Sequence, residues 1–293
     1  MRRLAILPIV LLAAACTAPI GGQSSSSPAP TASPTVQPPN DPAAAGRIVA
    51  RLEYVGGFTA PSYQLTRTPA VVVYGDGTVI TPGVTTAQYP GPLVSPLLQQ
   101  TLTPEGLALV RRAIDASGLT SAMSYPANGV ADAPDTQLEL HADQVDATVS
   151  QGMASDGMVT NPAEKAARKS FEALVAKLSD LTSLVGAANI TGAVPFEPTG
   201  LRLYLASSHV APTNSEVQGK VLAWPLRTPI AGFGAPYSTY GAMTCGAVTG
   251  TDFEALWSVF AQARQNGYFA QGGLFYTPSV RPLLPGEKAV CPA

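Results

Sequence analysis

Apolar and polar side chains alternate along residues 47–54, which is the spacing of a strand with one buried face. Ile48, Ala50 and Leu52 lie on one side of this expected strand, and Val49 lies on the other. The same alternation returns at residues 201–206. We therefore expect each of these two segments to open a set of strands.

Three further segments have the form of hairpins, because each joins two apolar runs through a short turn. Residues 70–81 turn at Gly75-Asp76-Gly77, where glycine supplies positive φ without strain. Residues 136–150 turn at Asp143-Gln144, and residues 268–280 turn at Gly272-Gly273. Residues 82–100 contain four prolines and are expected to form a loop.

Three segments carry apolar residues at the spacing of an amphipathic helix. The first runs from Thr103, an expected N-cap, to Gly118. The second follows a capping-box pattern at Asn161 and continues to Val185, and the third covers residues 251–267. Their charged residues lie off the apolar stripes, so we expect these helices to cover sheets.

Hairpins interleaved with helices, without the regular strand–helix alternation of a parallel sheet, predict an α+β fold. We expect mainly antiparallel sheets built from hairpins, with three principal amphipathic helices packed on them, in a globular domain over residues 47–293. The first and third helices share a layout of cap, glycine stop and strand. This faint similarity suggests the hypothesis of two similar lobes, residues 47–186 and 187–293.

The chain opens with a different pattern, in which Arg2 and Arg3 precede an uncharged apolar run, residues 4–15, and then Cys16. It resembles a bacterial lipoprotein signal peptide, with Ala13 where the family commonly has leucine. The resemblance implies removal of residues 1–15 and attachment of fatty acyl chains such as palmitate to Cys16. The apolar run reaches only about 18 Å, too short for a bilayer core of about 30 Å. An ordinary secretory signal cut elsewhere is the open alternative.

Residues 16–46 fit a lipidated cysteine followed by a disordered tether. This segment is rich in serine and proline, and its only charged residue is Asp41. Thirty residues of extended, proline-rich chain reach roughly 90 Å. The expected location is therefore the extracytoplasmic face of a cell membrane, with the protein held by its lipid. A plain disordered tail without a spacing role would have the same sequence.

Two cysteines remain, Cys245 and Cys291. In an oxidising exterior they most simply form a disulfide, which ties the C-terminus to the domain. A zinc site is the alternative, but no histidine is near them in sequence to complete it.

The net charge of the mature chain restricts the classes of partner that it is expected to bind. Without Arg2 and Arg3 the mature chain has 15 basic side chains (17 − 2) against 19 acidic ones, a net charge of −4. This balance argues against nucleic acid, which requires a basic face. The expected partners are the membrane, through the N-terminal lipid, and an unknown envelope protein or cell-wall ligand.

Candidate chemistry is sparse. In the expected hairpin of residues 136–150, His141 faces Asp146 on the exposed side, and we interpret the two as a surface pair rather than a catalytic dyad. Asp132 and Asp135 precede this hairpin and, with Asp143 and Asp146, leave a cation site as the less favoured hypothesis, and His209 lies in a loop without a nearby acid. We find no serine, cysteine or zinc hydrolase motif, and we predict no catalytic residue, metal site or cofactor.

The run Tyr-Gly-Asp-Gly-Thr-Val at residues 74–79 resembles the start of the soluble part of uncharacterised bacterial lipoproteins, a resemblance that implies no mechanism. The sequence favours a non-catalytic, membrane-anchored binding or interaction module of the cell envelope. The alternative is an envelope hydrolase or cell-wall enzyme with a carboxylate-based site, drawn from residues such as Glu139, Asp146, Asp132 or Asp135. A periplasmic-type solute receptor is less favoured, since it requires a longer parallel α/β chain.

Overall fold

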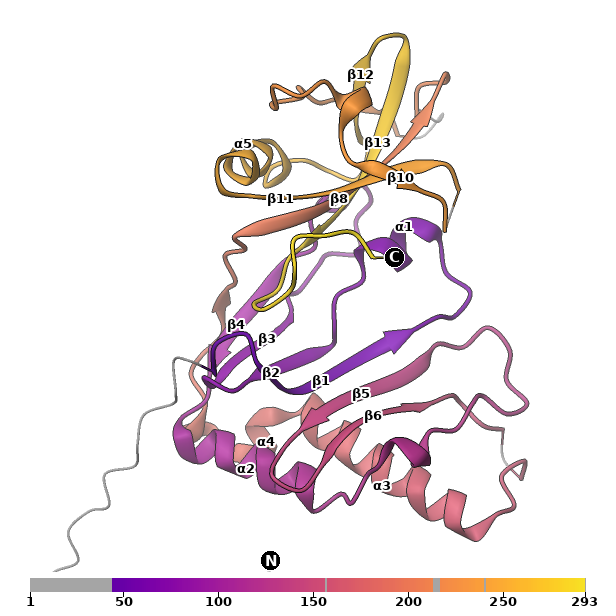
Figure 1. Ribbon diagram of the computed structural model, residues 1–293, viewed down its shortest axis with the longest axis vertical. Helices are drawn as coiled ribbons and strands as arrows, with labels where there is room; N and C mark the ends of the chain where they lie inside the picture. Colours follow the sequence, from indigo (N-terminus) through magenta and orange to yellow (C-terminus); the bar gives the residue numbers. More distant parts are fainter. Residues whose placement is uncertain (1–43, 156, 213–216, 240, 293) are drawn as a thin grey trace, which may run out of the picture. The chain divides into compact units, whose positions relative to one another are not determined.

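Two mainly antiparallel sheets and five α-helices make up the part of the chain that the computed structural model describes, residues 44–155, 157–212, 217–239 and 241–292 (Figure 1). The expected α+β class is confirmed. The described residues belong to one compact unit, residues 37–293. No helix among them is both long enough and apolar enough to span a membrane.

The first sheet contains seven strands in the order β6-β5-β1-β2-β3-β4-β7, all antiparallel. They are β1 (Ile48–Val55), β2 (Val71–Tyr74), β3 (Thr78–Pro82), β4 (Leu97–Thr101), β5 (Asp135–His141), β6 (Asp146–Gln151) and β7 (Val194–Pro195). Both hairpins predicted in this region are present, with Val73 opposite Val79 and Leu140 opposite Ala147.

Two expectations for this sheet were wrong. Residues 97–101 form β4 instead of loop, because their backbone pairs with β3 although their side chains do not alternate. An irregularity in the pairing of β1 with β2 between Ile48 and Ala50 changes which side chains point inward. Val49, expected on the polar side, is therefore buried in the same core as Ala50.

Helices α2 (Pro104–Asp115), α3 (Pro162–Ser179) and α4 (Leu181–Val185) contribute to the core of this first sheet. Thr103 caps α2 as predicted, since its hydroxyl accepts a hydrogen bond from the Gly106 amide (3.1 Å). Asn161 caps α3 through the amides of Ala163 and Glu164. The expected capping box is incomplete, because the Glu164 carboxylate pairs with Arg168.

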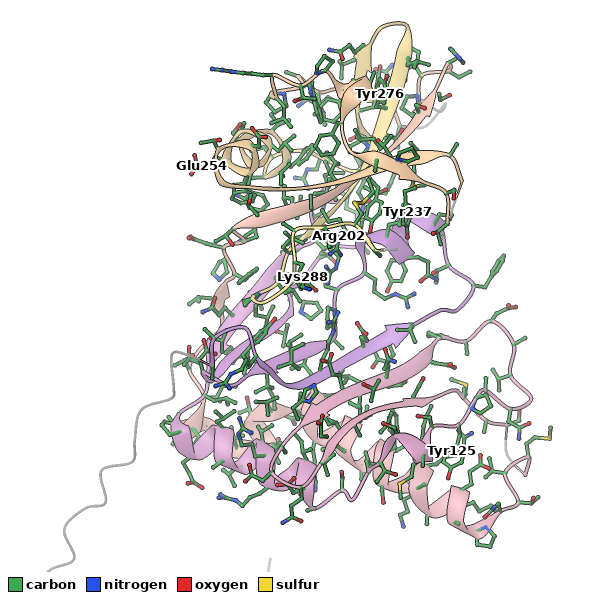
Figure 2. The ribbon with its side chains drawn as sticks, in the orientation of Figure 1. Tyr125, Arg202, Tyr237, Glu254, Tyr276 and Lys288 are labelled. Carbon is green, nitrogen blue, oxygen red and sulfur yellow. A yellow bond between two sulfur atoms is a disulfide. The ribbon has the colours of Figure 1, made fainter. Side chains whose placement is uncertain are left out.

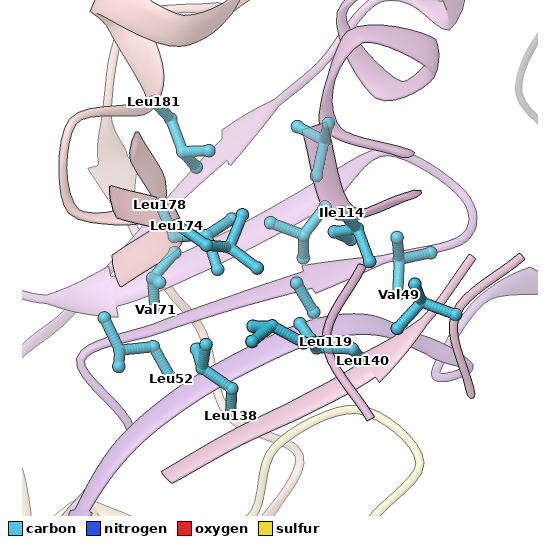
Figure 3. Packing of buried hydrophobic residues seen from close by; sticks show 14 of the residues in the cluster. Val49, Leu52, Val71, Ile114, Leu119, Leu138, Leu140, Leu174, Leu178 and Leu181 are labelled. Carbon is cyan, nitrogen blue, oxygen red and sulfur yellow. The ribbon is translucent and has the colours of Figure 1, made fainter. Parts of the chain in front are cut away.

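The helix predicted to run on to Val185 breaks at Asp180, whose backbone leaves the helical region. The Asp180 carboxylate accepts hydrogen bonds from the amide and hydroxyl of Ser183 and thereby caps α4. These hydrogen bonds lower the pKa of Asp180 below its usual value. The apolar stripe nevertheless continues across the break, since Leu178 and Leu181 enter the same core (Figure 3).

The second sheet contains six strands in the order β10-β11-β8-β13-β12-β9, antiparallel except for the β12–β9 pair. They are β8 (Gly200–Ser208), β9 (Lys220–Val221), β10 (Ala235–Tyr237), β11 (Met243–Thr249), β12 (Gly267–Gln271) and β13 (Leu274–Pro282). The hairpin predicted at Gly272-Gly273 joins β12 to β13. The two sheets draw their strands from residues 48–195 and 200–282, and the similarity of two lobes stays a prediction.

Helix α5 (Gly250–Phe260) packs on one face of this sheet through Phe253, Leu256 and Phe260. It begins before the predicted Thr251 cap, so the expected capping box is absent and Thr249 makes no side-chain cap. Short helix α1 (Pro61–Thr66), which the sequence did not predict, packs on the other face through Leu65. The 3₁₀ turns are η2 (Ser121–Met123), η3 (Ala187–Asn189) and η4 (Ile230–Gly232).

The two ends of the described chain pack against the domain. Leu284 joins Val72 and Tyr74 on the face of the first sheet opposite the helices. The domain also begins earlier than residue 47, the predicted boundary: Ala44 is only 5 % exposed, because its side chain sits over Gly75. Residues 44–46 thus belong to the folded part and not to the tether.

Candidate functional site

Of the three cysteines predicted as site residues, the structure describes two, Cys245 and Cys291. Cys245 and Cys291 form the predicted disulfide, with Cα atoms 6.0 Å apart. Near this bond, Arg202 donates a hydrogen bond to the Val290 carbonyl (3.0 Å) and so holds the C-terminal segment that carries Lys288 (Figure 2). Cys16, the predicted signal peptide and nearly all of the tether lie outside the described residues, so lipidation stays a prediction.

His141 lies between two carboxylates on the exposed side of β5 and β6. Its Nδ1 atom is 2.7 Å from Asp146, as the predicted register requires, and its Nε2 atom is 3.3 Å from Glu139. The imidazole side chain is 46 % exposed, which agrees with the interpretation as a surface pair. No serine, threonine or cysteine hydrogen-bonds to this histidine in the described segments.

The other candidate acids and histidine lie apart from this pair. Asp135 begins β5 opposite Val55, at the far end of the strand from His141, and Asp132 occupies the preceding loop with φ of 65°. His209 follows β8 and is exposed. Within the residues that the structure places, no three histidine, cysteine or acidic side chains gather as metal ligands would.

A hollow of about 320 Å³ opens beside His141, and it brings together Arg47, Arg111, His141 and Asp146. Helix α2 supplies Arg111, and the start of the domain supplies Arg47. This is a small charged depression in which the carboxylate of Asp146 offsets part of the positive charge.

A buried ion pair fixes the C-terminal segment to both sheets. Arg281 on β13 donates two hydrogen bonds of 2.7 Å to Glu287 and a third, of 3.0 Å, to the Arg67 carbonyl. Arg51 on β1 lies 3.8 Å from the same carboxylate. Burial alone would raise the pKa of Glu287, but the hydrogen bonds and charge of Arg281 outweigh burial and lower it below the usual value.

Tyr74 lies beside this ion pair on the buried outer face of β2. Burial, reinforced by the negative charge of Glu287, raises the pKa of the Tyr74 phenol above its ordinary value. The phenol therefore stays protonated at neutral pH. We assign this group of side chains, Arg51, Tyr74, Arg281 and Glu287, to the attachment of the C-terminal segment.

A groove of about 550 Å³ differs from the charged hollow beside His141, because no charged side chain among the described residues lines it. We call it the hydroxyl-lined groove. Nine of its lining residues carry a hydroxyl group: Ser62, Tyr63, Thr66, Thr85, Thr86, Tyr89, Ser95, Thr277 and Ser279. Gln88 and Gln265 add two amides. Tyr63 and Tyr89 are 55 % and 59 % exposed, so both rings are accessible to a ligand.

Helix α1 forms one wall of the groove. Leu65 anchors the helix against Tyr204 and Cys245 on the second sheet, which leaves Ser62 and Tyr63 on its exposed side. The Arg67 guanidinium lies 5.0 Å from the centre of the Tyr63 ring and orients it by a cation–π contact. Arg67 is itself held by the Tyr54 carbonyl and by the Gly56 carbonyl (3.1 Å).

The segment between β3 and β4 forms the opposite wall. Its backbone is tied to the chain after α5, since the Leu93 amide donates to the Ala263 carbonyl (2.9 Å) and the Gln265 amide donates to the Gly91 carbonyl (3.0 Å). Leu93 and Val94 are buried in the same core as α5. This part of the expected loop is therefore held in place.

Strand β13 forms the floor of the groove. It pairs with β8 from Phe275 to Pro282, whereas its pairing with β12 extends only from Leu274 to Tyr276. From Thr277 onward, no strand of the described chain pairs with one edge of β13. Pro278 is tolerated there because the missing amide removes no hydrogen bond from a ladder.

The side chains of the groove suit an uncharged ligand that makes many hydrogen bonds. Hydroxyl and amide groups both donate and accept, and exposed tyrosine rings stack on flat apolar surfaces. A charged ligand would lose hydration without gaining an opposite charge. None of the lining residues has a carboxylate, imidazole, amine or thiol.

A second uncharged hollow, of about 330 Å³, adjoins this groove at Pro92 and Ser95, which line both. We call it the apolar pocket. Its remaining lining residues are Val94, Pro96, Leu97, Pro195, Phe196, Pro198, Trp257, Ala261 and Pro282. Apart from the Ser95 hydroxyl and the Trp257 indole nitrogen, these side chains present carbon.

The sequence did not predict either hollow. Tyr237, in a segment rich in glycine and tyrosine, lines neither of them and packs on Tyr204 at 5.3 Å beside Cys245. One usable signal was present. Residues 77–104 contain no charged side chain, and they form the longest such run after residue 47, ahead of residues 228–251.

Comparison of the chain with models of protein families found no match. Comparisons with curated proteins and with solved structures also found none.

Proposed function

We propose that the protein is a membrane-anchored lipoprotein of the bacterial cell envelope whose domain binds an uncharged, hydroxyl-rich ligand without transforming it. The hydroxyl-lined groove carries this proposal, because nine hydroxyls, two amides and no charge surround it. This chemistry is that of a neutral saccharide, whose hydroxyls pair with the protein and whose apolar face stacks on tyrosine. The resemblance of residues 1–16 to a lipoprotein signal peptide supports the proposed lipid anchor.

Ligand binding can be tested by thermal shift with the full chain carrying Cys16→Ala, which has no acceptor for lipid. The panel would contain neutral oligosaccharides, acidic sugars and divalent cations. A ligand at 100 times its dissociation constant adds about 2.7 kcal/mol, a rise in Tm of roughly 5–11 °C for a domain of this size. We expect the rise with a neutral saccharide.

Three matched variants locate the binding. Thr277→Glu and Ser62→Glu each place a carboxylate in the groove from an exposed position, so neither disturbs the core. Ala166→Glu makes a comparable change on the exposed side of α3, outside both hollows. We expect the first two variants to lose the shift and the third to keep it. A shift with acidic sugars alone would contradict the proposal.

The anchor has a separate test. Cys16→Ala should move the protein from the membrane fraction to the soluble extracytoplasmic fraction, whereas Cys245→Ser/Cys291→Ser should leave it on the membrane. Retention of the Cys16→Ala variant on the membrane would show that the lipid is not what holds the protein.

One arrangement favours a second candidate, an envelope hydrolase with a carboxylate-based site. His141 contacts both Glu139 and Asp146, and His141 and Asp146 line the charged hollow of about 320 Å³. A carboxylate-bound imidazole can serve as a general base. Hydrolysis of a cell-wall fragment that His141→Ala abolishes would establish this candidate in place of simple binding.

A further inference from the structure

The hydroxyl-lined groove and the apolar pocket share one wall, the segment from Pro92 to Ser95. This wall is held in place, because Leu93 and Val94 are buried and the Leu93 amide is bonded to the chain after α5. The two hollows therefore keep their relation to each other within the domain.

Strand β13 also connects the two hollows. Thr277, Pro278 and Ser279 line the groove, and Pro282 lines the apolar pocket. At about 3.4 Å for each residue, Pro278 and Pro282 are about 14 Å apart along the strand. A ligand that occupies both hollows passes the edge of β13 that β12 leaves uncovered, next to the wall formed by Pro92 and Ser95.

The chemistry of the two hollows is complementary. The groove offers hydroxyls and amides, and the apolar pocket offers Trp257, Phe196 and several prolines. Neither is lined by a charged side chain. An exposed apolar pocket beside a polar groove is the arrangement expected for a ligand with one polar and one hydrocarbon part.

We propose, building on the proposed function, that the ligand is an uncharged amphiphile of the neutral glycolipid class. Its sugar lies in the hydroxyl-lined groove, and its hydrocarbon lies in the apolar pocket. Among the described residues, no charged side chain lines either hollow, which selects against anionic headgroups because they would be desolvated without a counter-charge.

Alkyl maltosides of increasing chain length test this inference against maltose, which has the same head without a tail. Binding would be measured by titration calorimetry below the micelle concentration, on the full chain carrying Cys16→Ala. Each methylene buried in the pocket should raise affinity about fourfold, the equivalent of about 0.8 kcal/mol. We expect affinity to rise from octyl to dodecyl maltoside until the pocket is filled.

Two variants assign the head and the tail to their hollows. Ala261→Glu places a carboxylate in the apolar pocket from an exposed position at the end of α5. It should lower the affinity for dodecyl maltoside by on the order of tenfold and leave the affinity for maltose unchanged. Thr277→Glu should lower the affinity for both ligands, and Ala166→Glu should lower neither. Dodecylphosphocholine, with the same tail and a zwitterionic head whose phosphate and ammonium would both be desolvated, should bind at least about tenfold more weakly than dodecyl maltoside.

Each other outcome has a definite meaning. Maltose binding that is lost in Thr277→Glu, with no gain from the alkyl chain, overturns the amphiphile and leaves the proposed function standing. Equal binding of dodecylphosphocholine and dodecyl maltoside, unaffected by Thr277→Glu, overturns both. Binding of a proline-rich peptide in place of the maltosides, or no maltoside binding at all, overturns the amphiphile.

Discussion

The Cys245–Cys291 disulfide should be a major source of stability for this domain. The two cysteines are 46 residues apart in sequence, and closing a loop of that length reduces the entropy of the unfolded chain by the equivalent of about 4 kcal/mol. At 2–4 °C for each kcal/mol in a domain of this size, Cys245→Ser/Cys291→Ser should lower Tm by roughly 8–16 °C. Scanning calorimetry measures this loss directly.

The fold itself should survive the substitution. The C-terminal segment remains attached through the Arg281–Glu287 pair and through Leu284, which packs on the first sheet. The far-ultraviolet circular dichroism spectrum should therefore be unchanged at 25 °C.

A chemical control uses the same protein. Reduction of the disulfide in the Cys16→Ala background should reproduce the loss of Tm, and the same reductant should leave the double serine variant unchanged. A loss below about 1 kcal/mol would refute the reasoning, since it would mean that the unfolded chain is not restricted by the bridge.

Three further changes probe the packing and the electrostatics of the domain. Glu287→Gln should cost about 3 kcal/mol at pH 7 in urea unfolding, because it leaves buried Arg281 without its counter-charge. Folding lowers the pKa of Glu287, so the wild-type protein should lose the stability contributed by the Arg281–Glu287 pair as pH falls through the folded pKa. The variant should lack this acid-dependent loss of stability. Identical pH profiles of the two proteins would contradict this assignment. Leu174→Ala should cost about 3 kcal/mol in the same assay, since Leu174 is 2 % exposed in the first core, whereas a loss below about 1 kcal/mol would show that the core refills the cavity. His141→Ala should cost less than about 1 kcal/mol, because the ion pairs of His141 are solvent-exposed, and a larger loss would mean that the pair is structural.

Local sequence patterns predicted those elements whose side chains carry their own periodicity. The hairpin at Gly75-Asp76-Gly77, the facing of His141 and Asp146 and the cap of α2 by Thr103 are all confirmed. In each case the residues that determine the conformation lie within a few positions of one another. The disulfide was also predictable, because only two cysteines remain after Cys16.

Elements whose conformation depends on other parts of the fold could not be predicted from the sequence pattern. Strand β4 has no alternating pattern and exists because β3 offers it a pairing edge, and Val49 is buried because an irregularity in β1 turns it inward. The break at Asp180 is local, because its carboxylate accepts from the amide of Ser183 three residues on, but the apolar stripe continues across it through Leu178 and Leu181. Neither a pairing edge nor this cap changes the periodicity of the side chains.

The sequence by itself determined the α+β class, the principal helices and hairpins, the disulfide and the expectation of an exported, lipid-anchored chain. Only the tertiary structure formed the groove in which we propose that a ligand lies. The hydroxyl-lined groove joins Ser62 on α1, Tyr89 in a loop and Thr277 on β13, residues separated by as much as 215 positions (277 − 62) in a chain of 293. Hydrogen bonds and side-chain burial bring them together, and neither has a spacing that the sequence displays.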